Sequence, residues 1–566
     1  MQSFDPVTLE VYWQRLISIA EEQAKTLTRT AFSSQAGEME DISSGIFDAR
    51  GRMMAQGVTG TVGVITALVR GVPEFLKQFP PDQLNPGDIL ISNDPWLLAG
   101  HLNDIAIVVP VFYGDRLIAF TATMSHATDI GGKTWTSGYG EVYEEGLCIP
   151  PMKLYERGKP QELLRLLEKN VREPEQVIGD VMAQITACNV GARKIRDFCA
   201  EERLTDLEDL SDTILSRSER AVRKAFASLP RGVYRSQALM DGFDQPLTIA
   251  ATLSVGGDEL VVDFTGTSPQ VPFAINSVHN YTLAHTVYAI KCVLCPDVPN
   301  NEGCFRPIRV TCPEGLLLNA THPAPVVSRH LVSTYINAVV SNTLAQVVPQ
   351  AAIAESGAAG IPIFSGYDDR KKSPFVYWFL CNGGMGARPT KDGMNAVSFP
   401  ANIATVSAEI VENVSPLFVI KKEIAIDTGG PGRYRGGCGT ELVMKVRGVQ
   451  SVALSPVYER CTYPAEGVLG GQAGEATRLS VNTGPMHPKK KTTLAPGDTF
   501  RAIHAGGGGF FAPSERAVEK VLEDVKNGYV SSESARSVYK VAINRETWTV
   551  DREQTRMLRE GRTAEV

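Results

Sequence analysis

The chain has 566 residues, of which 43% are hydrophobic, and it carries a formal net charge of -7. This length is enough for about three or four domains, and the absence of a basic charge excess argues against a nucleic-acid partner. The N-terminus shows no signal peptide, and no apolar run reaches the roughly 18 residues of a membrane span. Because the ten cysteines are scattered along the chain, we expect a cytoplasmic protein without disulfides.

The first 270 residues predict alternating helices and strands. Asp5 and Pro6 form a helix-start signal, and apolar residues then recur at helical spacing. The later segments are listed here in chain order: a strand–turn–strand unit at 41–56, a helix around 61–79, a strand at 89–92, helices within 162–229 and strands within 233–267. This order predicts sheets that are covered by helices.

The second half changes character near residue 400. Helices are predicted around 281–295 and 333–348, whereas the chain after residue 400 is rich in glycine and β-like. Gly506 to Gly509 predict a tight turn with close backbone contacts rather than an anion site, and Lys489 to Lys491 predict a solvated loop.

We therefore predict a mixed α/β, multi-domain fold with a glycine-rich, β-containing C-terminal region. The predicted units are an N-terminal α/β domain (1–240), a central α/β domain (241–400), a glycine-rich domain (401–513) and a charged helical arm (514–566).

The segment 89–132 predicts a β-hairpin with polar residues at its open end. Two apolar runs, 104–112 and 117–125, flank a turn at residues 113–116. A three-residue loop places Asp104 opposite His126, whereas a two-residue loop places Asn103 there and turns Asp104 to the other face. We favour the first register, because opposed side chains lie only about 4.5–5.5 Å apart.

In that register His101, Asp104 and His126 converge on one point. Two imidazoles and a carboxylate suit a divalent cation such as Zn, Fe or Mn, and three protein ligands leave room for water or substrate. A histidine near a strand end is more often structural than ligating. Here, however, two of only eight histidines fall beside an aspartate in one hairpin, which indicates a metal site.

Many stretches resemble the B component of the hydantoinase/oxoprolinase family, whose relatives include acetone and acetophenone carboxylases and ATP-dependent lactamases. The similar stretches span almost the whole chain and are 41–56, 87–95, 100–104, 126–132, 145–151, 263–268, 299–303, 306–308, 319–320, 323–326, 427–437, 506–510 and 521–531. The chain departs from the family pattern at Leu98 and Ala99, where small residues or glycine are usual, so the pocket beside the first histidine differs in shape.

The resemblance implies a hetero-oligomer. A partner A subunit would bind ATP and phosphorylate a weakly electrophilic carbonyl, and the B component would receive the activated intermediate at a metal held by His101, Asp104 and His126. The substrate would be a small cyclic amide such as a hydantoin, 5-oxoproline or another lactam. Asp129, Glu144 and Glu145 are candidates for general acid–base catalysis, with Asp129 first because it follows His126 by three residues.

The residues leave three alternatives open. A ketone carboxylase subunit would use the same metal together with activated bicarbonate. A non-haem iron oxygenase has the same ligand types, although its histidine and carboxylate are usually separated by one residue and not by two. A structural subunit would leave all catalysis to its partner.

Overall fold

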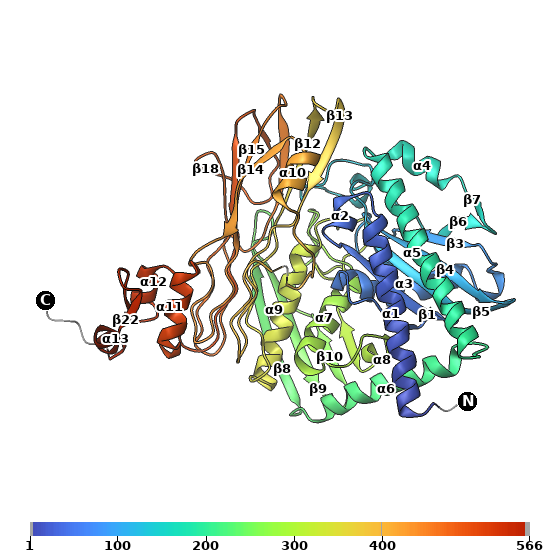
Figure 1. Cartoon of the computed structure of the whole chain (residues 1–566), viewed down its shortest axis with the longest axis horizontal. Coiled ribbons are helices and arrows are strands. Elements are labelled where there is room, and N and C mark those ends of the chain that lie inside the picture. The colour runs from blue at the N-terminus through green and yellow to red at the C-terminus, as the bar shows by residue number, and fades with distance from the viewer. Residues whose placement is uncertain (1–3, 398, 561–566) are drawn as a thin grey trace.

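The computed structural model describes residues 4–397 and 399–560 and shows an α/β molecule with several separate sheets (Figure 1). The mixed architecture, with helices over sheets and a glycine-rich β region near the C-terminus, confirms the predicted fold class. Within the described residues, no helix combines the length and the apolar character that a bilayer crossing requires. The last helices protrude from one end of the molecule, away from the N-terminal helices.

The first sheet has seven antiparallel strands in the order β2-β1-β5-β4-β3-β6-β7. Its strands are β1 (Ile42–Asp48), β2 (Met53–Gln56), β3 (Ile89–Ser92), β4 (Asp104–Tyr113), β5 (Arg116–His126), β6 (Met152–Glu156) and β7 (Lys159–Pro160). The helices α1 (Pro6–Thr30) and α5 (Pro174–Glu201) cover one face, and α3 (Val62–Gln78) packs on the other. The short helix α2 (Ser34–Gly37) follows α1.

The helix α1 begins where the sequence predicts. The side chain of Asp5 accepts hydrogen bonds from the backbone N–H groups of Val7 and Thr8, and Pro6 occupies the first helical position. The face that carries Leu9, Trp13, Leu16 and Ile19 is buried. The predicted helical region 162–229 is confirmed as α4 (Leu163–Asn170), α5 and α6 (Glu208–Ala227).

The turn between β4 and β5 differs from our preferred prediction. Gly114 and Asp115 form a two-residue loop, with Tyr113 opposite Arg116. Gly114 has a φ of 61°, which such tight hairpin turns require and which glycine adopts without strain. By itself this loop would place Asn103 opposite His126.

A β-bulge farther along the hairpin restores the register in which Asp104 pairs with His126. The strand partners of Val111 and Phe112 are not consecutive, because Ile118 is an extra residue on β5. From this point to the open end of the hairpin the ladder is displaced by one residue, so Asp104 faces His126 as predicted. The predicted pairing is confirmed, although the loop length from which it was argued is wrong.

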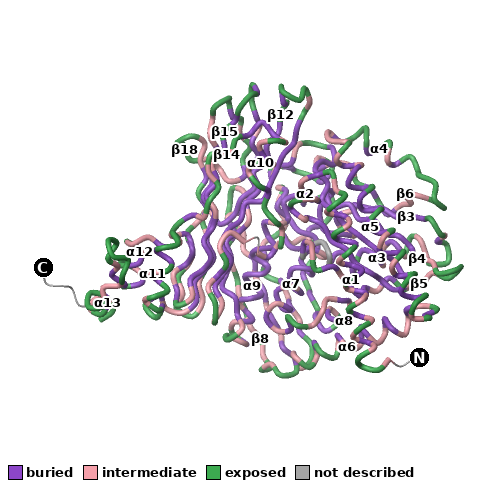
Figure 2. Tube along the Cα trace, in the orientation of Figure 1, coloured by how far each residue is buried: buried purple, intermediate pink, exposed green. Residues whose placement is uncertain are grey.

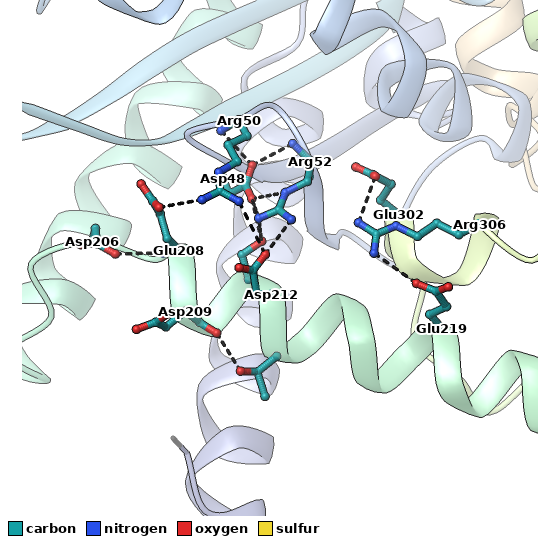
Figure 3. A network of polar contacts seen from close by, with 12 residues as sticks. Asp48, Arg50, Arg52, Asp206, Glu208, Asp209, Asp212, Glu219, Glu302 and Arg306 are labelled. Carbon is teal, nitrogen blue, oxygen red and sulfur yellow. Dashed lines mark hydrogen bonds and ion pairs between the residues drawn. The ribbon is translucent and has the colours of Figure 1, made fainter. Parts of the chain in front are cut away.

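A network of charged residues joins the β1–β2 turn to α6 (Figure 3). Asp48, which is buried, accepts hydrogen bonds from the backbone N–H groups of Arg50 and Arg52, from Arg52 Nε and from Ser211 Oγ. Asp212 pairs with Arg52 at 2.7 Å. The turn is therefore anchored to a helix more than 150 residues away in the chain.

The central part contains a four-stranded sheet in the order β11-β10-β9-β8. Its strands are β8 (Gly232–Met240), β9 (Leu247–Val255), β10 (Leu260–Asp263) and β11 (Ile308–Thr311), and the helices of this part are α7 (His279–Leu294), α8 (Glu302–Phe305) and α9 (His330–Val347). The helix α9 packs on β8 and β9, whereas α7 packs between α3 and α9. The predicted helices around 281–295 and 333–348 are confirmed.

The later part contains two more antiparallel sheets, in the orders β13-β12-β16-β19 and β14-β15-β20-β17-β18. Their elements are β12 (Ile361–Asp368), β13 (Ser373–Trp378), α10 (Ala408–Val414), β14 (Leu417–Ile424), β15 (Thr440–Val446), β16 (Val452–Val457), β17 (Arg478–Val481), β18 (Gly484–Pro485), β19 (Thr492–Leu494) and β20 (Thr499–Ile503). Figure 2 shows long buried stretches of chain running side by side next to these sheets.

These stretches are extended glycine-rich segments whose backbones touch. Gly437 donates a hydrogen bond to Met385, Gly507 donates to Gly437, and Gly430 donates to Gly507. A Cβ atom on Gly436 would lie 1.9 Å from the carbonyl oxygen of Gly507. The predicted close backbone contacts are confirmed, but residues 506–509 are extended and do not form a tight turn. Only glycine allows backbones to approach so closely.

The C-terminal arm is less helical than predicted. Its elements are α11 (Val518–Lys526), α12 (Ser532–Ser537), β21 (Ala542–Asn544), β22 (Thr549–Asp551) and α13 (Arg552–Arg559). The two strands form an antiparallel hairpin, and a small apolar core around Val521 and Tyr539 holds the arm together.

The prediction of a solvated loop at Lys489 to Lys491 is wrong for its first residue. Lys489 is fully buried, and its ammonium lies 2.7 Å from the carboxylate of Glu459, which is also fully buried. Burying the aliphatic stem together with a paired charge avoids the large cost of an isolated buried ion. Lys490 is exposed, as predicted.

Candidate metal centre

The structure brings His101, Asp104 and His126 together at the open end of the β4–β5 hairpin. Asp104 Oδ1 lies 2.9 Å from His101 Nε2 and 3.3 Å from His126 Nδ1. All three side chains are buried, and one ligand atom from each can be chosen so that all lie within 4.8 Å of one another. Asp104 and His126 are directly opposed strand residues, and His101 lies in the turn that precedes β4.

A backbone carbonyl orients the imidazole of His101. His101 Nδ1 lies 3.0 Å from the carbonyl oxygen of Val327, and a hydrogen bond there places the proton on Nδ1 and leaves the lone pair on Nε2. The preceding Gly100 has a φ of 88°, and a Cβ atom there would lie 2.7 Å from Arg329 Cδ. Glycine is therefore needed for both the turn and the close approach of Arg329.

Arg329 sets the charge of the site. Its Nη2 lies 2.5 Å from Asp104 Oδ2, its Nε donates to the carbonyl of Ala99, and its guanidinium stacks on Tyr281. Burial opposes ionisation of Asp104, but His101 and Arg329 outweigh this effect and hold its pKa well below the usual value. Burial and the charge of Arg329 lower the pKa of His101 to about 4. A neutral imidazole and an ionised carboxylate are the forms that bind metals.

The three residues line a buried cavity of about 60 Å³ that holds four of the eight histidines of the chain. The additional histidines are His285 on α7 and His330 at the start of α9. Burial lowers the pKa of His285 to about 3 and that of His330 well below its usual value. The Nε2 atoms of both have no hydrogen-bond partner among the described residues. These two atoms are therefore available to a ligand.

The rest of the cavity wall is mainly apolar and aromatic. The ring of Trp135 stacks on His126 at a centroid distance of 5.7 Å, and the ring of Trp378 meets His126 edge-on at 4.8 Å. Asp41 completes the polar part, with Oδ2 3.7 Å from His126 Nδ1 and with Oδ1 accepting from Thr61. Burial raises the pKa of Asp41.

The donor set fits a divalent cation. The Nε2 atoms of His101 and His126 are buried without a hydrogen-bond partner among residues 4–397 and 399–560. His101 Nε2 lies close to Asp104 Oδ1 without hydrogen-bond geometry, as two ligands of one ion do. Ligand atoms about 2.0–2.2 Å from an ion are at most about 4.4 Å apart, so small side-chain movements complete the site.

None of the three predicted acid–base residues lines the metal cavity. Asp129 is buried, and its carboxylate accepts from the backbone N–H and the guanidinium of Arg172. It lines a separate small cavity on the other side of Trp135 and Trp378. Glu144 is half-exposed and pairs with Lys133. The spacing of three residues from His126 does not bring Asp129 to the cavity, because the chain leaves the end of β5 there.

Glu145 supports the site from behind. It is 3% exposed, and its Oε1 accepts hydrogen bonds from the backbone N–H groups of Val326 and Val327. Burial raises its pKa to about 8, despite these two hydrogen bonds. Because the carbonyl of Val327 bonds His101, Glu145 holds the loop that orients a candidate ligand.

The sequence reasoning missed Arg329, His330 and His285. Arg329 directly precedes α9, and His330 is the first residue of this uncharged helix, which was a usable signal for a site at that helix end. His285 lies in the middle of α7 and offers no local signal. All three reach the cavity because α7 packs between α3, which lies on the first sheet, and α9, so residues of both helices line the same cavity as Asp104 and His126.

The fold and this cavity define a mixed α/β protein with a buried histidine–carboxylate site. The family profile "Hydantoinase B/oxoprolinase" matches residues 5–513, and the chain belongs to this family. A protein of Pseudomonas sp. (strain NS671) named as the B component of a D-/L-hydantoinase is 32% identical, with 99% of this chain and 98% of the relative covered. This agrees with the resemblance seen in the sequence.

Two solved structures share the fold. The crystal structure of an ATP-dependent caprolactamase from Pseudomonas jessenii superposes with a TM-score of 0.89 at 28% identity and covers 99% of this chain and 100% of its own. A nucleotide-free acetone carboxylase superposes with a TM-score of 0.86 at 17% identity, covering 98% of this chain and 83% of its own, which shows a common fold.

Proposed function

We propose that this chain is the metal-containing B component of an ATP-dependent hydrolase of cyclic amides. The observation that carries the proposal is the convergence of His101, Asp104 and His126, with unpartnered imidazole nitrogens, in a buried cavity. Relatives named for hydantoinase and ATP-dependent caprolactamase activity support the cyclic-amide substrate and the use of ATP. Because the hydantoinase relative is named as one component of a larger enzyme, it also supports a partner A subunit that binds ATP.

The chemistry requires an activated amide. A cyclic amide is resonance-stabilised, and transfer of the γ-phosphoryl group of ATP to its oxygen makes the carbon electrophilic. Water then adds to this carbon, the C–N bond breaks as the nitrogen takes up a proton, and a second water releases phosphate and leaves the carboxylate. A divalent cation in the cavity would polarise the substrate oxygen or lower the pKa of a water molecule.

The residues of this chain prepare the cavity for that reaction. His101, Asp104 and His126 would hold the cation, which would be Mn, Zn or Fe for this ligand set. Arg329 keeps Asp104 ionised, and Val327 keeps the lone pair of His101 on Nε2. Trp135 and Trp378 exclude water from this side of the cavity, which strengthens electrostatic interactions inside it.

Replacement of one candidate ligand tests the proposal. The complex with its A partner is assayed with hydantoin, 5-oxoproline and caprolactam, and with ATP, for the ring-opened product and for assembly. We expect His101→Ala to abolish ring opening while the complex still assembles, and His322→Ala, at an exposed histidine outside the cavity, to leave turnover unchanged. Unchanged turnover in His101→Ala would make this chain a structural subunit. Labelled bicarbonate retained in a ketone-derived product would instead identify a carboxylase.

A further inference from the structure

A second cavity, of about 540 Å³, lies beside the candidate metal centre. At three places in the chain, one residue lines the metal cavity and a residue one or two positions away lines the larger cavity. Asp41, Thr61 and Ala401 line the metal cavity, whereas Ser43, Gly60 and Asn402 line the larger one. In addition, the ring of Tyr288 in the larger cavity lies 5.8 Å from that of Phe399 in the metal cavity. The two cavities therefore share a thin wall.

Two loops form this wall, and a hydrogen bond links them. Asn402 Nδ2 donates to the carbonyl of Gly60 at 2.9 Å. The loop of Gly60 is held from outside by Glu21, which accepts from the backbone N–H groups of Val58 and Thr59. The Asn402–Gly60 contact therefore lies between the linings of the two cavities.

The larger cavity contains a buried cation without a counter-ion. Lys291, near the end of α7, is 7% exposed and lines the cavity. Its Nζ donates to the carbonyl of Val298 at 2.7 Å and forms no ion pair with any residue that the structure describes. An ammonium has three donors, so two remain for a ligand. The cavity lining among the described residues contains no carboxylate.

This arrangement selects an anion. A buried charge without a partner is costly, so a site that keeps one is suited to an oppositely charged ligand. Ser43 Oγ is buried without a hydrogen-bond partner among the described residues and adds a hydroxyl donor to the same lining, while Gln56 Oε1, equally without a partner, adds an acceptor for an N–H group of the ligand. Ile17, Val287 and Phe305 supply apolar surface beside them. The lining therefore suits a ligand with an anionic group and an apolar part.

The small size of the metal cavity also indicates that the substrate extends into the larger cavity. Its volume of about 60 Å³ is below the roughly 150 Å³ that accommodates benzene. A phosphorylated ring cannot fit there entirely, whereas its reacting carbon can lie near the candidate ligands if the remainder extends through the shared wall.

We propose that the larger cavity binds the phosphorylated cyclic substrate, with Lys291 holding the phosphoryl group. This inference rests on the proposed function for the identity of the ligand. Lys291 acts here as a binding residue that retains the intermediate beside the metal centre.

Binding of cyclopentyl phosphate to the full chain, without its A partner, tests the inference. Isothermal titration is carried out with metal-loaded and metal-free protein, with inorganic phosphate in a parallel series. We expect cyclopentyl phosphate to bind in both states and more tightly than inorganic phosphate, because the lining is partly apolar. Lys291→Met should weaken binding by about ten- to hundredfold, the effect of losing a hydrogen bond to a charged group.

Two control variants separate charge from structure. Lys291→Arg keeps the charge and should retain most of the affinity, and Lys526→Met, at an exposed lysine of α11, should change nothing. Melting temperatures of all variants show whether the fold is kept. A purely structural role, in which Lys291 only binds the Val298 carbonyl, would lower the melting temperature of Lys291→Met and leave no binding to lose.

Other outcomes overturn the inference. The inference is wrong if cyclopentyl phosphate does not bind, or if Lys291→Met does not weaken its binding. It is also wrong if binding disappears when the metal is removed, or if inorganic phosphate binds equally tightly.

In the complex with the A partner, Lys291→Met should raise the ratio of ADP to ring-opened product, because the phosphorylated intermediate escapes. If turnover of the complex requires His101 but binding of cyclopentyl phosphate does not require Lys291, the proposed function stands and this inference is refuted. If binding requires Lys291 but turnover does not require His101, only the proposed function is refuted.

Discussion

Arg329 Nη2 lies 2.5 Å from Asp104 Oδ2, so a residue that directly precedes helix α9 neutralises the central carboxylate of the N-terminal hairpin. Both side chains are almost completely buried. Burial, reinforced by the guanidinium, lowers the pKa values of His101, His285 and His330, which keeps these imidazoles neutral. One arginine therefore contributes to the charge state of several groups in the cavity.

Arg329→Met should destabilise the metal-free protein by about 3–5 kcal/mol, because it leaves the Asp104 carboxylate buried without a counter-charge. A divalent cation should restore much of this loss, since it supplies the missing positive charge. The measurement is the melting temperature with and without Mn²⁺ or Zn²⁺. In the matched variant Arg172→Met, which leaves Asp129 unpaired outside the cavity, the cation should give no extra recovery. Equal recovery in both variants would contradict the assignment.

Alanine at His101 or His126 should reduce metal affinity by more than about 100-fold, because even residues that only support a ligand contribute about 10–100-fold. The metal content after dialysis and competition with a chromogenic chelator measure this. His322→Ala should retain the wild-type metal content. A full complement of metal in both ligand variants would place the ion elsewhere.

Glu145 should make stability depend on pH. Its pKa is about 8 in the folded protein and near 4.5 when unfolded, so the folded state binds the extra proton between these values. The stabilisation is complete below about pH 4.5 and is lost as pH rises through about 8. Glu145→Gln, which stays neutral, should be more stable than the wild type at pH 8.5, by on the order of a few kcal/mol, and should differ little at pH 5. Denaturant unfolding at the two pH values measures this, and a constant difference across the range would refute the shift.

Asp48→Asn should cost about 2–4 kcal/mol, because it removes a buried carboxylate that accepts four hydrogen bonds in the network of Figure 3. Asp212→Asn breaks a more exposed pair with Arg52 and should cost less than about 1 kcal/mol. Denaturant unfolding followed by fluorescence compares the two variants. Similar losses would show that the network is not anchored at Asp48.

Gly436→Ala should prevent the glycine-rich segments from packing, because the new Cβ atom would lie 1.9 Å from a backbone oxygen. We expect a loss of folded yield or a large fall in melting temperature. Gly256→Ala is the control, since no atom lies within 4 Å of a Cβ at that position. A mild effect at Gly436 would mean that the segments can separate without cost.

Local patterns in the sequence predicted most helices and strands of the first 350 residues. The cap at Asp5, the turn glycine at Gly114 and the alternating apolar strands act within a few residues, so they are visible in the chain itself. The same patterns predicted the convergence of His101, Asp104 and His126, because opposed strand residues are neighbours in any hairpin of that register.

Tertiary structure decided what surrounds these three residues. The bulge at Ile118 corrected a register that the turn alone would have displaced, and it leaves no trace in the hydrophobic pattern. Arg329, His330 and His285 reach the cavity because α9 packs on α7 and α7 packs on α3 beside the hairpin sheet, while Asp129, close to His126 in sequence, turns away. Hydrogen bonding along a strand is a short-range effect that the sequence encodes locally, whereas the burial that sets charge and reactivity depends on which distant surfaces meet.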